Sequence, residues 1–121
     1  MRILGFSEKL EKLNKKEFTS FRPRRKDRDW GVCEDVQVVY KPRSKNREVL
    51  GVAKIIEREP RFMASYMLGG QFAFNVSHLE AVEDGFENIV EMMKWFKKTY
   101  GEDCLTQKVM NKLTLRWVGR E

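Results

Sequence analysis

Apolar and polar residues alternate most regularly in two neighbouring runs, residues 32–40 and 48–57. In the first run, Val36, Val38 and Tyr40 fall at every second position, which is the spacing of a strand with one buried face. The second run is rich in Val, Leu and Ile, and a turn with several basic residues separates it from the first. The pattern therefore predicts a β-hairpin with a long charged tip.

Shorter apolar runs predict further strands on either side of this hairpin. Residues 2–6 and 18–22 are expected to form strands near the beginning of the chain, and residues 113–118 a strand near its end. Gly51, inside the second hairpin strand, indicates a β-bulge or a bend. Pro60 is expected to break the strand pairing.

Helical spacing appears in three segments. Ser7 is predicted to cap a short helix that places Leu10 and Leu13 on one apolar face. Ser77 and Glu80 have the spacing of a capping box, which predicts a second short helix ending near residues 84–85. A longer helix is expected from residue 87 or 88 to residue 100. It carries one apolar stripe that we expect to be buried in the core: Ile89, Met92, Met93, Phe96 and Tyr100.

Residues 58–75 show neither the alternation of a strand nor the apolar spacing of a helix. The segment contains several apolar residues and the flexible pair Gly69–Gly70, and Phe72 and Phe74 are consistent with a short strand. A segment of this composition predicts either a lid over a site or, if it is exposed, an interaction surface. Because strands and helices do not alternate as in βαβ units, the whole pattern predicts an α+β fold with a mixed or mainly antiparallel, barrel-like sheet.

Length and charge narrow the class of protein. A chain of 121 residues with 41% hydrophobic and 35% charged residues predicts one folded domain, residues 1–121. The net charge of +6 favours polyanionic partners such as RNA, DNA or anionic lipid. The alternative is a lysine-rich surface that is solvated and binds nothing.

Metal and cofactor signatures are missing. Cys33 and Cys104 stand far apart, and His78 is the only histidine, so the sequence predicts no structural zinc site and no cofactor. Nothing resembles a signal peptide or a membrane span, so we expect a cytoplasmic protein with two reduced thiols and no membrane partner. The pattern leaves the oligomeric state open.

The strongest concentration of charge lies between residues 15 and 30, which contain seven basic and three acidic residues and so carry a net charge of +4. Basic side chains here are expected to neutralise phosphates of RNA or a nucleotide, and Trp30 could stack on an unpaired base. Alternatively, Trp30 plugs one end of the barrel. The predicted nucleic-acid-binding residues are Lys15, Arg22, Arg24, Arg25, Lys26, Arg28 and Trp30.

Several motifs, in this order, resemble the ASCH domain family, a branch of the PUA-like small β-barrels. The resemblance covers most of the chain and rests on Asn14-Lys15-Lys16, Thr19 to Arg22, Glu34 to Val38, Gly51 to Ile55, Glu80 to Phe86 and Leu113 to Val118. Asn14 stands where the family usually has glycine, and the interval from Lys16 to Arg22 is one residue longer than usual. The resemblance implies a small PUA-like mixed β-barrel flanked by two or three helices.

The same resemblance implies a cleft suited to RNA or a nucleotide. Some family members remove the acetyl group of acetylated cytidine with a lysine, a threonine and an acid, and others are thought to bind or cleave RNA. Carried over to this chain, the candidate catalytic residues are Lys16, Thr19 (or Ser20) and Asp84. Chemically, a lysine with a lowered pKa could activate a hydroxyl nucleophile. In the alternative interpretation these are a surface cation, a strand residue and a helix-capping residue.

Overall fold

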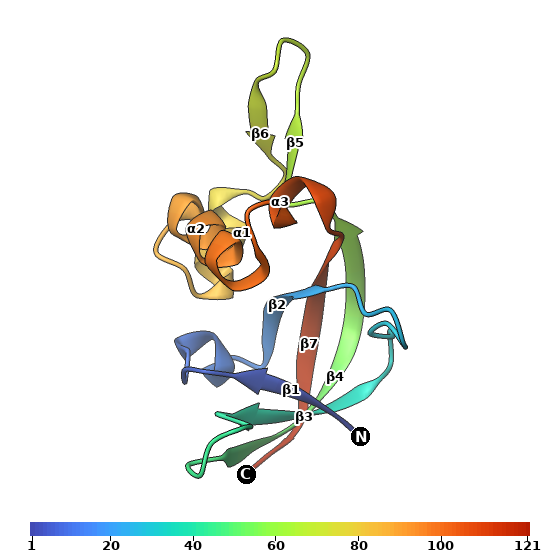
Figure 1. Cartoon of the computed structure of the whole chain (residues 1–121). Coiled ribbons are helices and arrows are strands. Elements are labelled where there is room, and N and C mark those ends of the chain that lie inside the picture. The colour runs from blue at the N-terminus through green and yellow to red at the C-terminus, as the bar shows by residue number, and fades with distance from the viewer.

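The computed structural model describes residues 1–121 and shows an α+β fold in which a curled sheet carries helices along one side (Figure 1). The strands are β1 (Arg2–Phe6), β2 (Glu17–Pro23), β3 (Asp35–Tyr40), β4 (Glu48–Arg61), β5 (Ala64–Tyr66), β6 (Phe72–Phe74) and β7 (Met110–Arg120). The helices are a 3₁₀ turn η1 (Glu11–Asn14), α1 (His78–Asp84), α2 (Ile89–Tyr100) and α3 (Cys104–Gln107).

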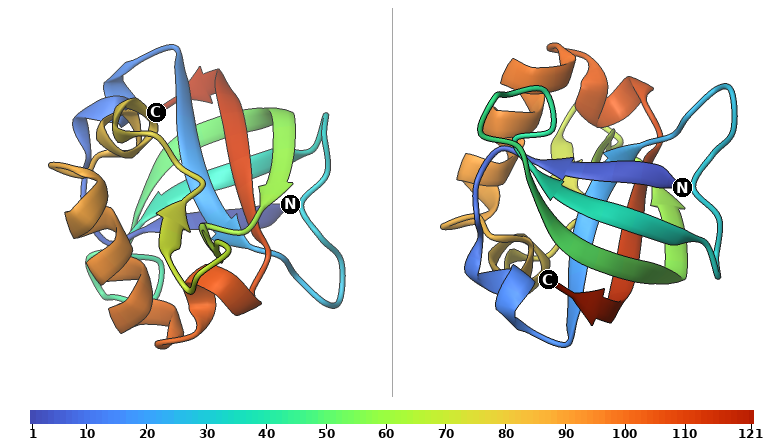
Figure 2. Two further views of the ribbon diagram at one scale, coloured as in Figure 1. Left: turned by 90° about the horizontal axis from the view of Figure 1, so that it is seen from above. Right: turned by 90° about the horizontal axis from the view of Figure 1, so that it is seen from below.

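Five strands form the main sheet, in the order β1-β3-β4-β7-β2. Only β1 and β3 run parallel, and every other pair is antiparallel, so the predicted α+β class and mixed sheet are confirmed. The sheet curls into an open half-barrel, as seen from above and below in Figure 2. Its two edge strands, β1 and β2, are far apart in the sheet order but not in space, since the Arg22 guanidinium of β2 donates to the Gly5 carbonyl of β1.

Apolar side chains form two buried clusters. One lies within the curl of the sheet and includes Leu4, Val36 and Ile55, and the partly buried Leu10 packs against it. The second lies between the sheet and the helices and includes Phe21 and Phe96. The helices therefore cover one end of the half-barrel with a core of their own.

The predicted hairpin of β3 and β4 forms, but its bounds differ: β3 begins at Asp35 rather than at residue 32, and β4 continues to Arg61 rather than ending at residue 57. The register between the two strands shifts next to Gly51, as a bulge requires. A Cβ on Gly51 would lie 2.3 Å from the Gly119 carbonyl oxygen, and its φ of +145° also favours glycine. The prediction that Pro60 ends pairing is wrong, since Pro60 pairs with Asn111. β3 pairs with β4 only as far as Lys54, so at Pro60 the strand β4 has β7 as its one neighbour. The missing N–H of proline therefore interrupts no hydrogen bonds to a strand on the other side.

The long helix is confirmed, and its stripe contributes Met92, Met93 and Phe96 to the core. The capping box of α1 is also confirmed, and Gly85 ends that helix in a left-handed conformation. The helix expected from Ser7 is wrong: only a single 3₁₀ turn forms, and its N-cap position is Leu10, which has no side-chain cap. Helix α3 was not predicted, because four residues are too few to show a period.

Segment 58–75 is not a lid. Its first part continues β4, and the rest forms the β5–β6 hairpin, which projects away from the body (Figure 1). The short strand at Phe72 and Phe74 is confirmed as β6.

Glu80 joins α1 to two strands of the sheet. One carboxylate oxygen accepts from the Ser77 backbone N–H at 3.0 Å and from Arg61 at 3.0 Å, and the other accepts from Lys112 at 2.7 Å. Partial burial opposes ionisation, but these donors outweigh it and lower the pKa of Glu80 from 4.5 to about 2.

Replacing Glu80 with Gln should cost stability at neutral pH. A pKa lowered from 4.5 to about 2 corresponds to about 3 kcal/mol of folding free energy, present above the unfolded pKa and lost as pH falls through the folded pKa. Denaturant unfolding of the wild type and Glu80→Gln should therefore show a gap near pH 7 that closes towards pH 2. Glu83→Gln, an exposed change on the same helix, is the control and should behave as the wild type. An equal gap at both pH values would contradict the role of the Glu80 charge.

Candidate functional site

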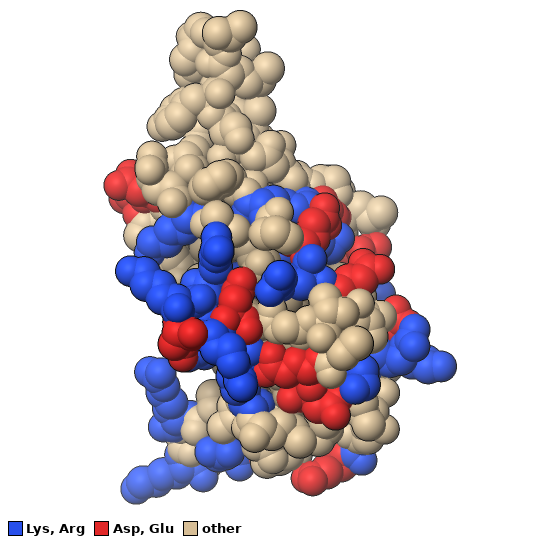
Figure 3. Space-filling model, turned by 90° about the vertical axis from the view of Figure 1, so that its right-hand side faces the viewer, with Lys and Arg blue, Asp and Glu red and all other residues tan.

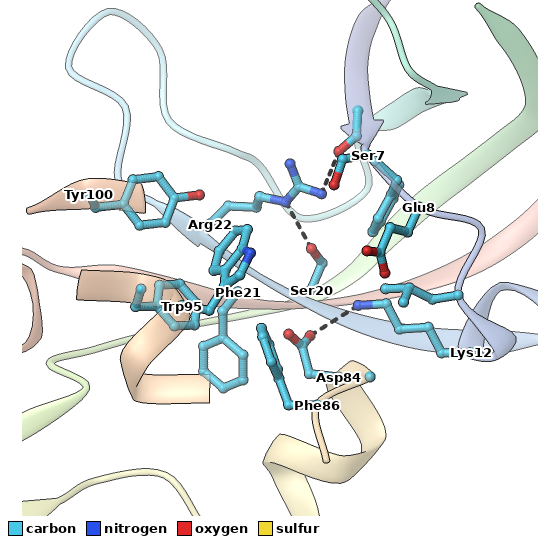
Figure 4. Close-up of a pocket in the computed structure, with 15 residues that line it drawn as sticks. Ser7, Glu8, Lys12, Ser20, Phe21, Arg22, Asp84, Phe86, Trp95 and Tyr100 are labelled. Carbon is cyan, nitrogen blue, oxygen red and sulfur yellow. Dashed lines mark hydrogen bonds and ion pairs between the residues drawn. The ribbon is translucent and has the colours of Figure 1, made fainter. Parts of the chain in front are cut away.

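A cavity of about 310 Å³ opens between the two edge strands of the half-barrel and the helices. Gly5 and Phe6 of β1 line one side, Ser20 to Arg22 of β2 line another, and residues from the end of α1 and from α2 complete it (Figure 4). Here the edge strands β1 and β2 do not pair with each other, so the curled sheet stays open. The size lies at the small end of the range for ligand pockets, which starts at about 300 Å³.

A buried ion pair lies at one end of the cavity. The Lys12 ammonium donates to Asp84 Oδ1 at 3.1 Å and to the Thr19 carbonyl at 2.7 Å, and both charged side chains are less than a tenth exposed. Burial lowers the pKa of Lys12, with the Asp84 carboxylate opposing the shift. Burial likewise raises the pKa of Asp84, with Lys12 and Arg22 opposing it. Both groups are thus more easily neutralised than their exposed counterparts.

The position of Asp84 contradicts local helix preferences. It is the last residue of α1, where the partial negative charge of the helix dipole disfavours an anion. Gly85 follows it directly, and a Cβ there would lie 3.1 Å from the Leu10 side chain. The tight turn at Gly85 thus brings the end of α1 against the η1 segment, which carries Lys12.

Arg22 and Ser20 form the second polar group. The Arg22 guanidinium donates through Nε to Ser20 Oγ at 2.8 Å and through Nη2 to the Gly5 carbonyl at 2.8 Å. Its charge lies 4.8 Å from the centre of the Phe6 ring, a cation–π contact. In Figure 4, Ser20 lies between Arg22 and the Lys12–Asp84 pair, and the Tyr100 hydroxyl points towards Arg22.

Aromatic rings make the remaining wall. Each of Phe86, Trp95, Phe96 and Tyr100 contacts at least two of the others, with ring centroids 5.3 to 6.2 Å apart. Trp95 remains 42% exposed, so it stands at the mouth rather than in the core. The cavity therefore combines flat apolar surfaces with a few polar groups held in fixed positions, the usual character of a small-molecule site.

The charges lining the cavity balance. Lys12 and Arg22 contribute two positive charges, and Glu8 and Asp84 two negative ones. The cavity is therefore polar but not basic, although the whole chain carries +6. It is suited to a ligand with both hydrogen-bond donors and acceptors rather than to a bare polyanion.

Of Lys16, Thr19 and Asp84, only Asp84 lines this cavity. Lys16 is exposed and does not line it, so the structure does not bring Lys16 together with Asp84. Lys12, which lies within η1, occupies that place. Thr19 lines a second pocket with Lys15, because neighbouring residues of a strand face opposite sides. Lys12 lines both pockets. Ser20, the alternative to Thr19, is the hydroxyl that faces the cavity.

The predicted nucleic-acid-binding residues do not form one surface. Arg22 lies in the cavity, whereas Arg24, Arg25, Lys26 and Arg28 are exposed on the loop that follows β2. Figure 2 shows this loop and helix α2 on opposite sides of the molecule.

Acidic neighbours also reduce the charge of this loop. Arg25 pairs with Asp27 at 3.3 Å, and Arg28 lies 3.7 Å from Glu34. On the face of the molecule in Figure 3, basic and acidic side chains are interspersed rather than separated. The net positive charge that the loop presents is consequently smaller than its run of basic residues indicates.

The structure does not place Trp30 where it could stack on a base. Trp30 is only 4% exposed and belongs to the cluster within the curl of the sheet, as in the alternative interpretation. Arg2 covers its ring at 4.4 Å and is held there by Glu34. The alternation of apolar and polar residues in a strand could not predict the burial of Trp30, because Trp30 lies in a loop.

No group of three or more His, Cys, Asp or Glu side chains comes together as metal ligands would. None of the helices is long and apolar enough to cross a membrane.

Sequence reasoning missed Lys12, and little in the sequence could have identified it. Lys9, Lys12, Lys15 and Lys16 follow one another in a polar segment with no feature that distinguishes them. For Ser20, a signal existed: strand alternation places it on the same face as Arg22 and opposite to Thr19.

Comparison with known proteins identifies no matching protein-family model, no matching curated protein and no matching solved structure. The resemblance to the ASCH family therefore stays a prediction.

Replacing Lys12 with Met should leave the Asp84 carboxylate buried without its counter-charge. Removing one partner of a buried pair typically costs about 3–5 kcal/mol, so chemical unfolding at pH 7 should show a loss of that order. Because burial raises the pKa of Asp84, acidification should protonate it and recover part of the loss. Lys16→Met is the matched control and should change stability by less than about 0.5 kcal/mol. Equal effects of the two substitutions would contradict the importance of the buried pair.

Proposed function

We propose that the protein binds a single nucleoside, either free or as one nucleotide of an RNA, in the cavity between β1, β2 and α2. The observation that carries this proposal is the combination of an aromatic wall with fixed donors and acceptors inside one small cavity. A nucleobase is flat, has π faces for stacking, and presents donors and acceptors along its edge. Each of these properties has a counterpart among the residues that line the cavity.

The stacking partners are on α2 and just before it. Phe86 and Trp95 offer ring surface at the mouth of the cavity, and base–aromatic stacking contributes roughly 1–3 kcal/mol per base. Asp84 can accept from an exocyclic amino group, whereas Arg22 can donate to a carbonyl or ring nitrogen. Ser20 can do either. A pyrimidine or purine edge would thus replace hydrogen bonds that these groups now make with one another.

The balanced charges favour recognition of the base over recognition of phosphate. Binding of a polyanion depends on salt because Lys and Arg side chains displace the counterions of its phosphates. The cavity has two positive and two negative side chains around it, so it carries no excess positive charge to do this. Binding of a nucleoside should therefore depend little on salt. Any contribution from the exposed loop of Arg24 to Arg28 would be separate and salt-dependent.

The resemblance to the ASCH family supports the same proposal. That resemblance implies a PUA-like fold with a cleft for RNA or a nucleotide, and the open half-barrel with a cavity beside its helices is compatible with this architecture. Under this proposal, Lys12, Ser20, Arg22 and Asp84 are the polar residues of the site.

Nucleoside binding should weaken when Trp95 is truncated. Calorimetric titration with cytidine, uridine, adenosine, guanosine and acetylated cytidine should detect at least one ligand. Trp95→Ala should weaken its binding by roughly fivefold to a hundredfold, the equivalent of one stacking contact. Phe72→Ala removes another ring that is also 42% exposed, but on the projecting hairpin, and should leave binding unchanged. If none of the nucleosides binds, and a short single-stranded RNA does not bind either, the proposal is wrong.

Hydrolysis of an amide on the bound nucleoside is a second candidate function. The observation that favours it is a lysine with a lowered pKa in the same cavity as a strand hydroxyl and a carboxyl group. Ser20 Oγ would attack the acyl carbon while neutral Lys12 accepts its proton. That proton would pass to the departing amine as the C–N bond breaks, and water would then release the acid from Ser20. Asp84 would hold Lys12 in position.

Substitution of Ser20 separates this reaction from binding. With acetylated cytidine as substrate, Ser20→Ala should abolish acetate release and keep nucleoside affinity within a few fold. Thr19→Ala, a hydroxyl on the other face of β2, should keep full turnover. Turnover by Ser20→Ala would exclude Ser20 as the nucleophile. Absence of acetate release by the wild type would remove the hydrolase candidate and leave the binding proposal intact.

A further inference from the structure

The β5–β6 hairpin exposes an apolar surface that the proposed nucleoside site does not use. Tyr66 pairs with Phe72 across the hairpin, and Phe74 lies two residues further on the same face. The rings of Tyr66 and Phe72 are 5.6 Å apart, and those of Phe72 and Phe74 are 5.5 Å apart. Leu68, at the tip, is fully exposed. The opposite face carries only the small residues Ser65 and Ala73.

The exposed apolar area is large for a protein that acts as a monomer. Phe62, Tyr66, Met67, Leu68, Phe72 and Phe74 are all at least 41% exposed. Taking about 200 Å² for a fully exposed large side chain, they present roughly 700 Å² of apolar surface. The largest apolar patch of a typical monomer is about 300–600 Å², whereas a standard interface buries about 800 Å² per partner.

The hairpin is also free of charge. Residues 62–76 contain no Asp, Glu, Lys or Arg, although the whole chain carries +6. In Figure 3 the projecting part of the molecule has no charged side chains, and all the basic and acidic ones lie on the body below it. Two copies would repel each other through most of their surface, but not through this segment.

The base of the hairpin is well anchored, so its orientation is defined. Met63 and Ala64 are buried in the core beneath the helices. The Asn75 side chain donates to the Phe62 carbonyl at 3.0 Å and to Ser65 Oγ at 2.8 Å. The outer part has no such support, and a two-stranded hairpin is at best marginally stable in water. A partner that covers the aromatic face would complete it.

We propose that this partner is a second copy of the chain, and that two hairpins pack aromatic face to aromatic face about a two-fold axis. A two-fold contact uses the same patch on both copies, and a patch without charge is compatible with itself. Because the hairpin projects from the body, the two positively charged bodies remain apart. The nucleoside cavities lie on the bodies and stay open in such a dimer.

The test is the oligomeric state of the full chain in solution. Sedimentation velocity over a series of protein concentrations should show a monomer–dimer equilibrium. Leu68→Asp would bury a charge twice in the symmetric interface, and should raise the dimer Kd by about a hundredfold or more. Val90→Asp introduces the same charge at a side chain that is 50% exposed on α2, and should leave the equilibrium unchanged.

Two outcomes would overturn the proposal. One is a wild-type chain that stays monomeric at every concentration, and the other is a dimer that Leu68→Asp does not weaken. A parallel sedimentation experiment with phosphatidylcholine–phosphatidylserine vesicles tests whether the hairpin binds a lipid surface. A monomer that binds vesicles through Leu68 would show that the hairpin contacts a lipid surface instead of a second copy.

Discussion

The buried pair of Lys12 and Asp84 is the interaction on which the candidate site depends. Taking two charges out of water costs several kcal/mol for each, and their attraction offsets that cost only when the geometry is good. Well-packed apolar side chains often stabilise such a contact equally well. Stability alone therefore does not explain the pair, and a buried pair with shifted pKa values in a cavity marks a candidate functional site.

The cavity itself follows from the way the sheet curls. A five-stranded mixed sheet with strong twist brings its edges β1 and β2 near each other without pairing them. Arg22 spans the remaining gap by donating to the Gly5 carbonyl, and the aromatic residues of α2 cover it from the other side. The same opening that leaves the barrel incomplete provides space for a ligand, beside polar groups that now pair with one another.

Elements with a strong local signal could be predicted from the sequence. The capping box of Ser77 and Glu80, the stripe of α2 and the alternation of β3 all depend on neighbours within a few residues, and all three formed as expected. Short or weakly periodic elements could not be predicted in this way. Helix α3 has only one turn, and the polar segment before β2 formed a 3₁₀ turn instead of the expected helix.

The sequence by itself determined the α+β class and the mixed sheet, and it singled out Asp84 and the β2 segment, both of which line the cavity. Only the tertiary structure decided which lysine joins Asp84, since Lys12 and Asp84 are 72 positions apart and the other nearby lysines have the same chemistry. It also decided that Trp30 belongs to the core and that acidic side chains pair with the basic loop. Burial and charge pairing depend on residues brought together from distant parts of the chain, and no local pattern records them.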